Sequence, residues 1–274
     1  METLPSHWLS LVAVVFLLGL KHGLDPDHLA AIDGLTRFNA ANRPRLSRWS
    51  GLLFSAGHGL IVTAIAVAVA TVASEWRTPI WLEDAGAWIS IAFLTLLGVV
   101  NLASVVRTPR GETVRPVGLR GRVFARLLHS RHLGSLMRVE HPVLVAAVGA
   151  AFALSFDTVS QAVLFSITGS NIAGWLFAAS LGLVFTAGMM ATDALNGLWV
   201  SRMLERSAAQ QAAASRMMGI AIGVAAFAIA AAGAWRHASQ NDALESWGLA
   251  LSIAVMASVA AAYVLGQRMN LRST

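Results

Sequence analysis

Seven apolar segments alternate along the chain with short polar stretches. A helix that crosses a membrane needs about 20 mostly apolar residues. The segments that reach this length lie at roughly residues 8–32, 50–73, 85–106, 142–166, 172–200, 215–235 and 246–267. The fifth segment is long, and a later start of its helix near Trp175 stays open. The pattern predicts an all-α, polytopic integral membrane protein with about seven transmembrane helices.

The composition agrees with this fold class. The 274 residues are 56% hydrophobic and 12% charged, whereas a soluble domain is about 45–50% apolar and about 25% charged. The chain has no cysteine, which excludes disulfides and thiolate metal sites. Glu2 and the lack of a basic residue before the first apolar run do not fit a cleaved secretory signal. We therefore expect the first apolar segment to be retained as a helix.

Basic residues are divided unevenly between the segments that join the spans. Nearly all arginines lie in 37–49, 107–141, 201–216 and the C-terminal tail, which fall on one side if there are seven spans. The other side has Arg77 and Arg236 beside several acidic residues. Because Lys and Arg mark cytoplasmic loops, we expect the N-terminus outside and the C-terminus in the cytoplasm. The net charge of +6 then reflects topology, and nucleic acid is not an expected partner.

Residues 107–141 form the one sizeable polar segment. Apolar residues alternate with arginines at helical spacing over 119–128, which predicts a basic amphipathic helix lying on the inner leaflet. His129, His132 and His141 also lie in this cytoplasmic loop. We interpret them as ordinary surface residues, with metal capture as the alternative.

Two short matches indicate an internal duplication. Phe-Ser-Ala-Gly-His at 54–58 resembles Phe-Thr-Ala-Gly-Met at 185–189, an offset of 131. Leu-Asp-Pro at 24–26 resembles Phe-Asp-Thr at 156–158, an offset of 132. An odd number of helices per unit would invert one unit relative to the other, as in many transporters.

This duplication divides a single membrane domain, 1–274, into successive parts. We predict an inverted 3+3 repeat plus one helix: a first three-helix unit at 1–106, the basic loop at 107–141, a second unit at 142–235, and the last helix and tail at 236–274. In this arrangement Asp25 and Asp157 are symmetry mates.

The heptapeptide His-Gly-Leu-Asp-Pro-Asp-His at 22–28 interrupts the end of the first apolar segment. Ionisable groups at bilayer depth are costly and usually functional, and histidine with carboxylate suits borderline divalent metals. Pro26 would clash with the carbonyl of residue 22 in a straight helix. We therefore expect a break near His22 that brings it toward Asp27 and His28. The alternative is a kinked helix whose histidines bond only to neighbours.

Further polar residues lie at a similar depth in other spans. We predict a metal site formed by His22, Asp27, His28 and His58. Asp157 and Asp193 are candidate waypoints or proton acceptors, with Asn196 at a similar depth. For His58 the alternative is a packing role beside two glycines, and for the two aspartates it is a hydrogen bond between helices.

Four motifs, in order along the chain, resemble those of the nickel/cobalt transporter family (NiCoT). They are His22-x4-Asp27-His28 followed by Leu-Ala-Ala-Ile-Asp33, then Phe54 to His58, Leu154 to Thr158, and Ala187 to Gly197. The resemblance implies high-affinity uptake of Ni²⁺ or Co²⁺ across a prokaryotic inner membrane or a fungal membrane, with the signature His and Asp residues touching the ion. The resemblance also adds two residues, Asp33 and Thr158, to the predicted pathway or supporting residues. The full set is then Asp25, Asp33, Asp157, Thr158, Asp193 and Asn196.

The chain departs from the family pattern in a few places. Members usually have eight spans, and we expect the one before the signature helix to be absent here. Asn196 stands where an Asp is common, and Gln161 where a Glu is common. Pro26 also resembles a related branch of metal exporters, which tend to have Gly at the position of Asp27 and a His-rich loop. Asp27 and a loop with few histidines favour import, with export as the alternative.

Energy coupling and other function classes follow from what the chain contains. There is no Gly-x4-Gly-Lys-Ser/Thr motif, so we expect neither ATP hydrolysis nor an ATPase subunit, and no cofactor besides the transported ion. A divalent cation entering a negative-inside cell gains about 4.6 kcal/mol per 100 mV, which favours a secondary carrier or uniporter.

Two alternatives belong to other classes. An intramembrane metallohydrolase needs an open water position and a general base, and the chain has no His-Glu-x2-His. A membrane metal sensor would need a sizeable soluble segment to contact its partner, and only residues 107–141 could supply one. We therefore expect a transporter and not an enzyme. Ligand type does not separate nickel from cobalt, and the oligomeric state is not indicated.

Overall fold

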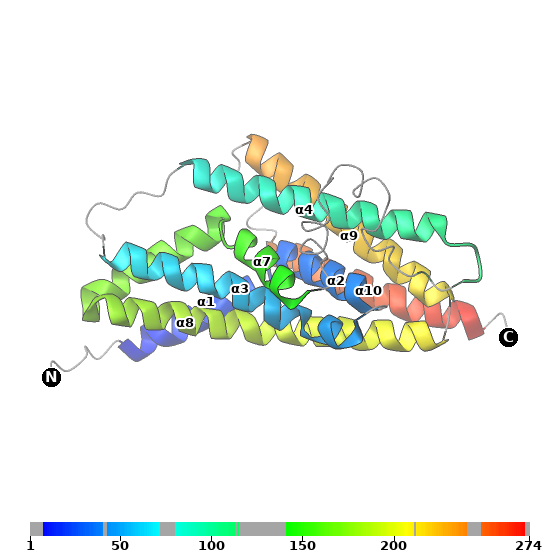
Figure 1. The fold of residues 1–274 in the computed structure, drawn as a ribbon, viewed down its shortest axis with the longest axis horizontal. Helices are drawn as coiled ribbons and strands as arrows, with labels where there is room; N and C mark the ends of the chain where they lie inside the picture. The colour runs from blue at the N-terminus through cyan, green and yellow to red at the C-terminus, as the bar shows by residue number, and fades with distance from the viewer. Residues whose placement is uncertain are drawn as a thin grey trace.

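The computed structural model describes residues 8–40, 43–71, 80–112, 114, 141–210, 212–239 and 248–271. Within these ranges all regular structure is helical (Figure 1). The helices are α1 (Trp8–His22), α2 (Pro26–Ala40), α3 (Pro44–Thr71), α4 (Ile80–Arg107), α7 (Pro142–Phe152), α8 (Phe156–Gln210), α9 (Ala212–Ser239) and α10 (Gly248–Leu271). The predicted all-α fold class is confirmed. The predicted amphipathic helix at 119–128, with His129 and His132, lies outside the described residues.

Long apolar helices confirm a polytopic membrane fold. In the described ranges, four helices are long and apolar enough to cross a membrane: Pro44–Thr71, Ala87–Arg107, Thr158–Arg206 and Ala212–Ser239. The bent pair formed by α1 and α2 qualifies as a fifth if it is counted as one span. Pro142–Phe152 and Ala250–Gly266 are apolar but shorter. The count of seven spans stays a prediction.

The predicted break near Pro26 is confirmed. α1 ends at His22, α2 begins at Pro26, and the two helices bend by 56°. The carbonyl of His22 accepts a hydrogen bond from the Asp25 N–H at 3.0 Å, so the break satisfies the group that the proline leaves without its helical partner. Asp25 stands before Pro26, where a short acidic side chain followed by proline suits the start of a helix.

α2 also runs further than the first apolar segment suggests. Arg37, which we placed in a cytoplasmic loop, lies inside α2 and is only 1% exposed. Its Nη2 donates to the carbonyl of Ser215 in α9 at 3.1 Å. The loop prediction is wrong here because α2 packs against several other helices, and one of them supplies an acceptor for the charge.

A second break divides the segment that we predicted as one helix over 142–166. α7 ends at Phe152 and α8 begins at Phe156. No proline stands here, but Ser155 precedes the first residue of α8, and its Oγ lies 2.9 Å from the Thr158 hydroxyl. Serine is a favoured N-cap residue. The continuous helix is therefore wrong, and the signal that could have indicated the break is Ser155, a residue type that favours helix starts.

α8 contains two arms that run in opposite directions. Ala173 (φ −149°, ψ 24°) and Gly174 (φ 75°, ψ −173°) interrupt the helical backbone, and Figure 1 shows the chain reversing at one end of the molecule. The positive φ at Gly174 favours glycine. The second arm starts at Trp175, which agrees with the later start left open for the fifth segment. It then continues to Gln210, so the predicted loop at 201–216 is largely helical.

The two breaks share one backbone pattern at an offset of 130 residues. Three hydrogen bonds at the first break, Gly23 to Gly19, Leu24 to Lys21 and Asp25 to His22, recur as Ala153 to Gly149, Leu154 to Ala151 and Ser155 to Phe152. This register pairs Asp157 with Asp27. The predicted pairing of Asp157 with Asp25 is therefore wrong by two residues, because only the backbone register, and not a short match of letters, defines equivalence.

Close helix crossings also repeat between the two units, at an offset of 130 residues for the positions in α1 and α7 and of 131 for those in α3 and α8. A side chain at Gly19 would overlap the carbonyl of Phe185, and one at Gly149 would overlap that of Phe54. Likewise, Gly188 lies against the carbonyl of Phe16, and Gly57 against that of Ala146. Each crossing changes into its mate when the two units are exchanged. These paired crossings agree with the predicted duplication, and the bounds of the two units stay a prediction.

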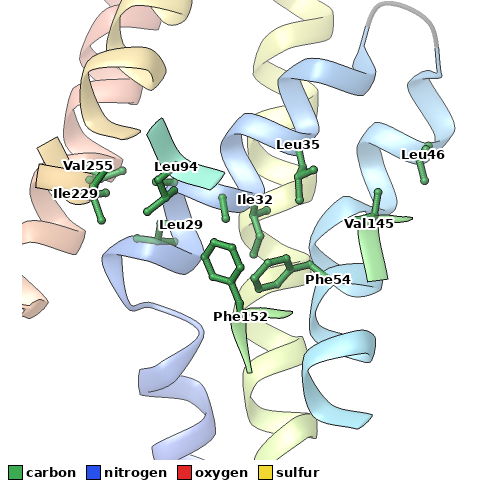
Figure 2. Close-up of a cluster of buried hydrophobic side chains, with 13 residues drawn as sticks. Leu29, Ile32, Leu35, Leu46, Phe54, Leu94, Val145, Phe152, Ile229 and Val255 are labelled. Carbon is green, nitrogen blue, oxygen red and sulfur yellow. The ribbon is translucent and has the colours of Figure 1, made fainter. Parts of the chain in front are cut away.

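The core around α2 joins the two units. Figure 2 shows Phe54 of α3 and Phe152 of α7 facing each other beside Leu29 and Ile32 of α2. The two rings form an edge-to-face pair with centroids 5.4 Å apart. Leu94, Ile229 and Val255 extend the cluster to α4, α9 and α10. The helix that follows the first break is thus held on several sides, which fixes the position of its first turn.

Candidate metal centre

Three histidines from three helices meet at the first break. His22 ends α1, His28 lies in the first turn of α2, and His58 lies in the middle of α3. Each offers a ring nitrogen, and these nitrogens lie within 4.8 Å of one another. The residues are 3%, 1% and 0% exposed. Within the described ranges, these three histidines form a group that could hold a metal ion.

The rings converge on a small volume. The Nε2 atoms of His22 and His58 are 3.3 Å apart. The ring centroids are 4.6 Å apart for His22 and His28, 4.8 Å for His28 and His58, and 5.2 Å for His22 and His58. Neutral imidazole nitrogens gathered in this way suit Ni²⁺, Co²⁺ or Zn²⁺, with positions left for further ligands.

Carboxylates stand behind two of the rings. His22 Nδ1 lies 2.9 Å from Asp25 Oδ2, and His28 Nδ1 lies 3.3 Å from Asp193 Oδ2. Ser55 donates from Oγ to the same Asp193 oxygen at 2.6 Å. A carboxylate on one ring nitrogen orients the imidazole and leaves the other nitrogen for an ion. Ser55 is a supporting residue that the sequence did not single out, although it lies one turn before His58.

Asp27, a predicted ligand, is not in the group of three residues whose ring nitrogens lie within 4.8 Å of one another, and its role as a ligand stays a prediction. It lies in the first turn of α2 and is partly exposed, and its Oδ1 accepts a hydrogen bond from the His28 backbone N–H at 3.0 Å. Neighbouring positions on a helix point about 100° apart, so Asp27 and His28 face different directions. Of the two carboxylates in this heptapeptide, Asp25 is the one with a close contact to a ring nitrogen, at His22 Nδ1.

The second unit contributes a hydroxyl to the histidine group. Thr158 Oγ1 lies 3.1 Å from His22 Nε2 and 3.4 Å from His58 Nε2, and the residue is fully buried. It therefore stands beside the space that the rings enclose. Asp157 precedes it in the first turn of α8, and its side chain lies outside the described part of the structure.

Asp33 and Asn196 form a separate polar pair. Asn196 Nδ2 donates to Asp33 Oδ1 at 3.0 Å, and the residues are 5% and 3% exposed. They lie further along α2 than His28 and further along α8 than Asp193. The structure therefore places these two predicted supporting residues together, but apart from the histidine group.

Other residues weighed from the sequence have ordinary roles. Met189, which matches His58 in the repeat, is fully buried in an apolar cluster with Phe185 and Val62. His141 is exposed and accepts a hydrogen bond from the Val143 N–H at the start of α7. Both placements agree with the structural alternatives.

Comparisons with known proteins point to one family. The sequence model of NicO, described as a high-affinity nickel-transport protein, matches residues 8–268. The chain is 31% identical over 211 residues to the nickel transporter NicT of Mycobacterium tuberculosis, covering 68% of this chain and 55% of that protein. It is 30% identical over 207 residues to the cobalt transport protein NhlF of Rhodococcus rhodochrous, covering 69% and 58%.

The nickel-transport protein NixA of Helicobacter pylori is 28% identical over 214 residues, covering 69% of this chain and 62% of that protein. The chain thus spans about half to three-fifths of the length of these relatives. No solved structure matches it.

Proposed function

This chain belongs to the NicO family of high-affinity nickel-transport proteins, and on that premise we propose that it carries Ni²⁺ or Co²⁺ across a prokaryotic cytoplasmic membrane. The observation that supports this most directly is the buried group of His22, His28 and His58 at the break between α1 and α2. We take these three imidazoles as the ligands of the transported ion.

The electrostatics of the group favour a divalent cation. Buried imidazoles are neutral ligands, so the ion's charge needs compensation from nearby. Asp25 and Asp193 lie behind His22 and His28 and together carry two negative charges as carboxylates. An ion with two positive charges would therefore be balanced without a carboxylate in direct contact.

The remaining predicted residues fit around this centre as pathway and supporting groups. Thr158 closes the group from the second unit, with Asp157 beside it in sequence. Asp27 stays a candidate for receiving the ion at the partly exposed side of the break. In this proposal, residues 1–106 and 142–235 are the two halves of one transport domain, followed by 236–274.

Transport in this proposal is inward and driven by the membrane potential. The N-terminus lies outside, and the ends of α2 and α8 lie on the cytoplasmic side, because arginines gather there. The inward movement of two charges releases about 4.6 kcal/mol per 100 mV, so no ATPase subunit is needed.

Flux into proteoliposomes tests the function. The purified chain is reconstituted, a potential of either sign is imposed, and uptake of Ni²⁺ and Co²⁺ is measured for the wild type, His28→Ala and His141→Ala. His141 is a matched control because it is exposed and caps α7. We expect flux in the wild type and His141→Ala, increased by an inside-negative potential, and none in His28→Ala. Undiminished flux in His28→Ala would contradict the proposed site. Net movement of the ion only from the cytoplasmic face of the protein to its outer face would assign export.

A further inference from the structure

We propose that two phenylalanines, Phe185 and Phe54, are gates that separate the histidine group from the outer and the cytoplasmic side of the membrane in turn. The proposal rests on the transport function and the orientation proposed above, and it adds the residues that control access to the ion. Both residues are 0% exposed, and each ring packs on a different histidine of the group.

The two rings cover the histidine group at close range. The ring centroids of Phe185 and His22 are 5.4 Å apart, and those of Phe54 and His28 are 5.1 Å apart. Because His22 and His28 are only 3% and 1% exposed, an ion reaches the imidazoles only after the groups around them move. The two phenylalanine rings are in direct contact with the ligands, so their movement controls access.

α3 and the second arm of α8 are antiparallel, which gives the site two opposite sides. A side chain at Gly51 would overlap the carbonyl of Asp193, and one at Gly59 would overlap the side chain of Thr186. Positions later in α8 therefore lie beside positions earlier in α3. In the proposed orientation, the start of α3 and the end of α8 face the cytoplasm, because arginines gather there.

Phe54 and Phe185 lie on these opposite sides of the histidines. Phe54 comes four residues before His58 in α3, which is about 6 Å closer to the cytoplasmic end. Phe185 precedes Thr186, which lies beside Gly59, so it stands on the outer side of His58. Long side chains in a helix point back toward its N-terminus. That direction is cytoplasmic for α3 and outward for this arm of α8.

Apolar side chains close the path behind each ring. Phe185 belongs to a buried cluster that includes Val62 and Phe165, whereas Phe54 belongs to the cluster that includes Leu29 (Figure 2). The rings of Phe185 and Phe165 are 5.6 Å apart between centroids. Apolar constrictions gate ions by excluding water, so a hydrated divalent cation passes neither cluster while its rings stay packed.

Each ring is held by a different short helix. The carbonyl of Phe185 lies against Gly19 of α1, and that of Phe54 lies against Gly149 of α7. α1 and α7 are the helices that end at the two breaks. Rotation of one of them about its break would uncover one ring and leave the other covered. The two sides then open in turn, as the movement of one repeat against the other requires.

Labelling of a single thiol from one side of the membrane tests the gates. The chain has no cysteine, so Thr158→Cys places one thiol beside the histidine group, where Thr158 Oγ1 lies 3.1 Å from His22 Nε2. This variant is reconstituted in one orientation, and a membrane-impermeant cationic thiol reagent is added on one side. We expect slow labelling from both sides. Adding Phe185→Ala should accelerate it at least about tenfold from the outer side alone, and Phe54→Ala should do so from the cytoplasmic side alone.

Phe93→Ala is the matched control. The Phe93 ring packs on Phe152 in the cytoplasmic cluster, with centroids 5.5 Å apart, and its removal should leave labelling slow from both sides. Phe185→Leu and Phe54→Leu keep more apolar volume and should give smaller increases with the same sidedness. They keep the test decisive if the alanine variants fold poorly.

The sidedness of labelling decides the outcome. Faster labelling from both sides in each variant would indicate a general loosening of the protein and overturn the proposal. So would unchanged labelling in the alanine and leucine variants. Absence of Ni²⁺ and Co²⁺ flux in the wild type would instead refute the transport function, whatever the labelling shows.

Discussion

The break at Gly23–Asp25 and the break at Ala153–Ser155 have the same backbone hydrogen bonds and different side chains. Where the first unit has His22 and His28, the second has Phe152 and Thr158, and where the first has His58, the second has Met189. The backbone hydrogen bonds of the two breaks repeat, while the three clustered histidines all lie in the first predicted unit. The second predicted unit places a hydroxyl and a carboxylate beside them.

The glycine crossings offer the strongest test of the duplication. We expect Gly57→Val and Gly188→Val to lower folding stability by about 3 kcal/mol or more, because each new side chain would meet a backbone carbonyl that cannot rotate away. Thermal unfolding of the purified protein in detergent measures this.

Gly233→Ala is the control for these variants, since the nearest atom to an added methyl is Ile91 Cγ1 at an ordinary 3.5 Å. If one of Gly57→Val and Gly188→Val is tolerated and the other is not, the two crossings are not equivalent.

The carboxylate that the second unit contributes gives the next largest effect. We expect Asp193→Asn to weaken Ni²⁺ binding by about 10–100-fold, as removal of the partner behind a metal-bound histidine commonly does. Competition with a chelating dye measures the affinity. Ser55→Ala, which keeps the carboxylate, should lose less. Wild-type affinity in Asp193→Asn would mean that the second unit does not support the site through His28.

Thr158 gives the smallest expected effect on this comparison. We expect Thr158→Val, which keeps the shape and removes the hydroxyl, to change Ni²⁺ affinity by less than about tenfold, because a neutral hydrogen bond contributes about 0.5–1.5 kcal/mol. Isothermal titration measures it. A loss comparable to that of His28→Ala would show that the hydroxyl is itself a ligand.

Several features of the site could be predicted because they depend on local chemistry. Pro26 fixes the first break, and the surrounding polar residues fix the candidate ligands. The resemblance to nickel/cobalt transporters, a family of transport proteins and not of enzymes, is confirmed by the family match. The second break was missed because a serine before a helix is a weaker signal than a proline, and Arg37 was misplaced because its hydrogen-bond partner lies in a distant helix.

The sequence by itself determined that the chain is a helical membrane protein of this family, with histidines at a broken first span. The length of an apolar segment and the geometry of a proline are local properties of the chain, so they can be recognised without knowing the fold. The tertiary structure decided which carboxylate faces which imidazole and that Thr158 completes the group, across more than a hundred residues. Those contacts depend on glycines that let helices of the two units approach closely, and no local pattern specifies which backbones will meet.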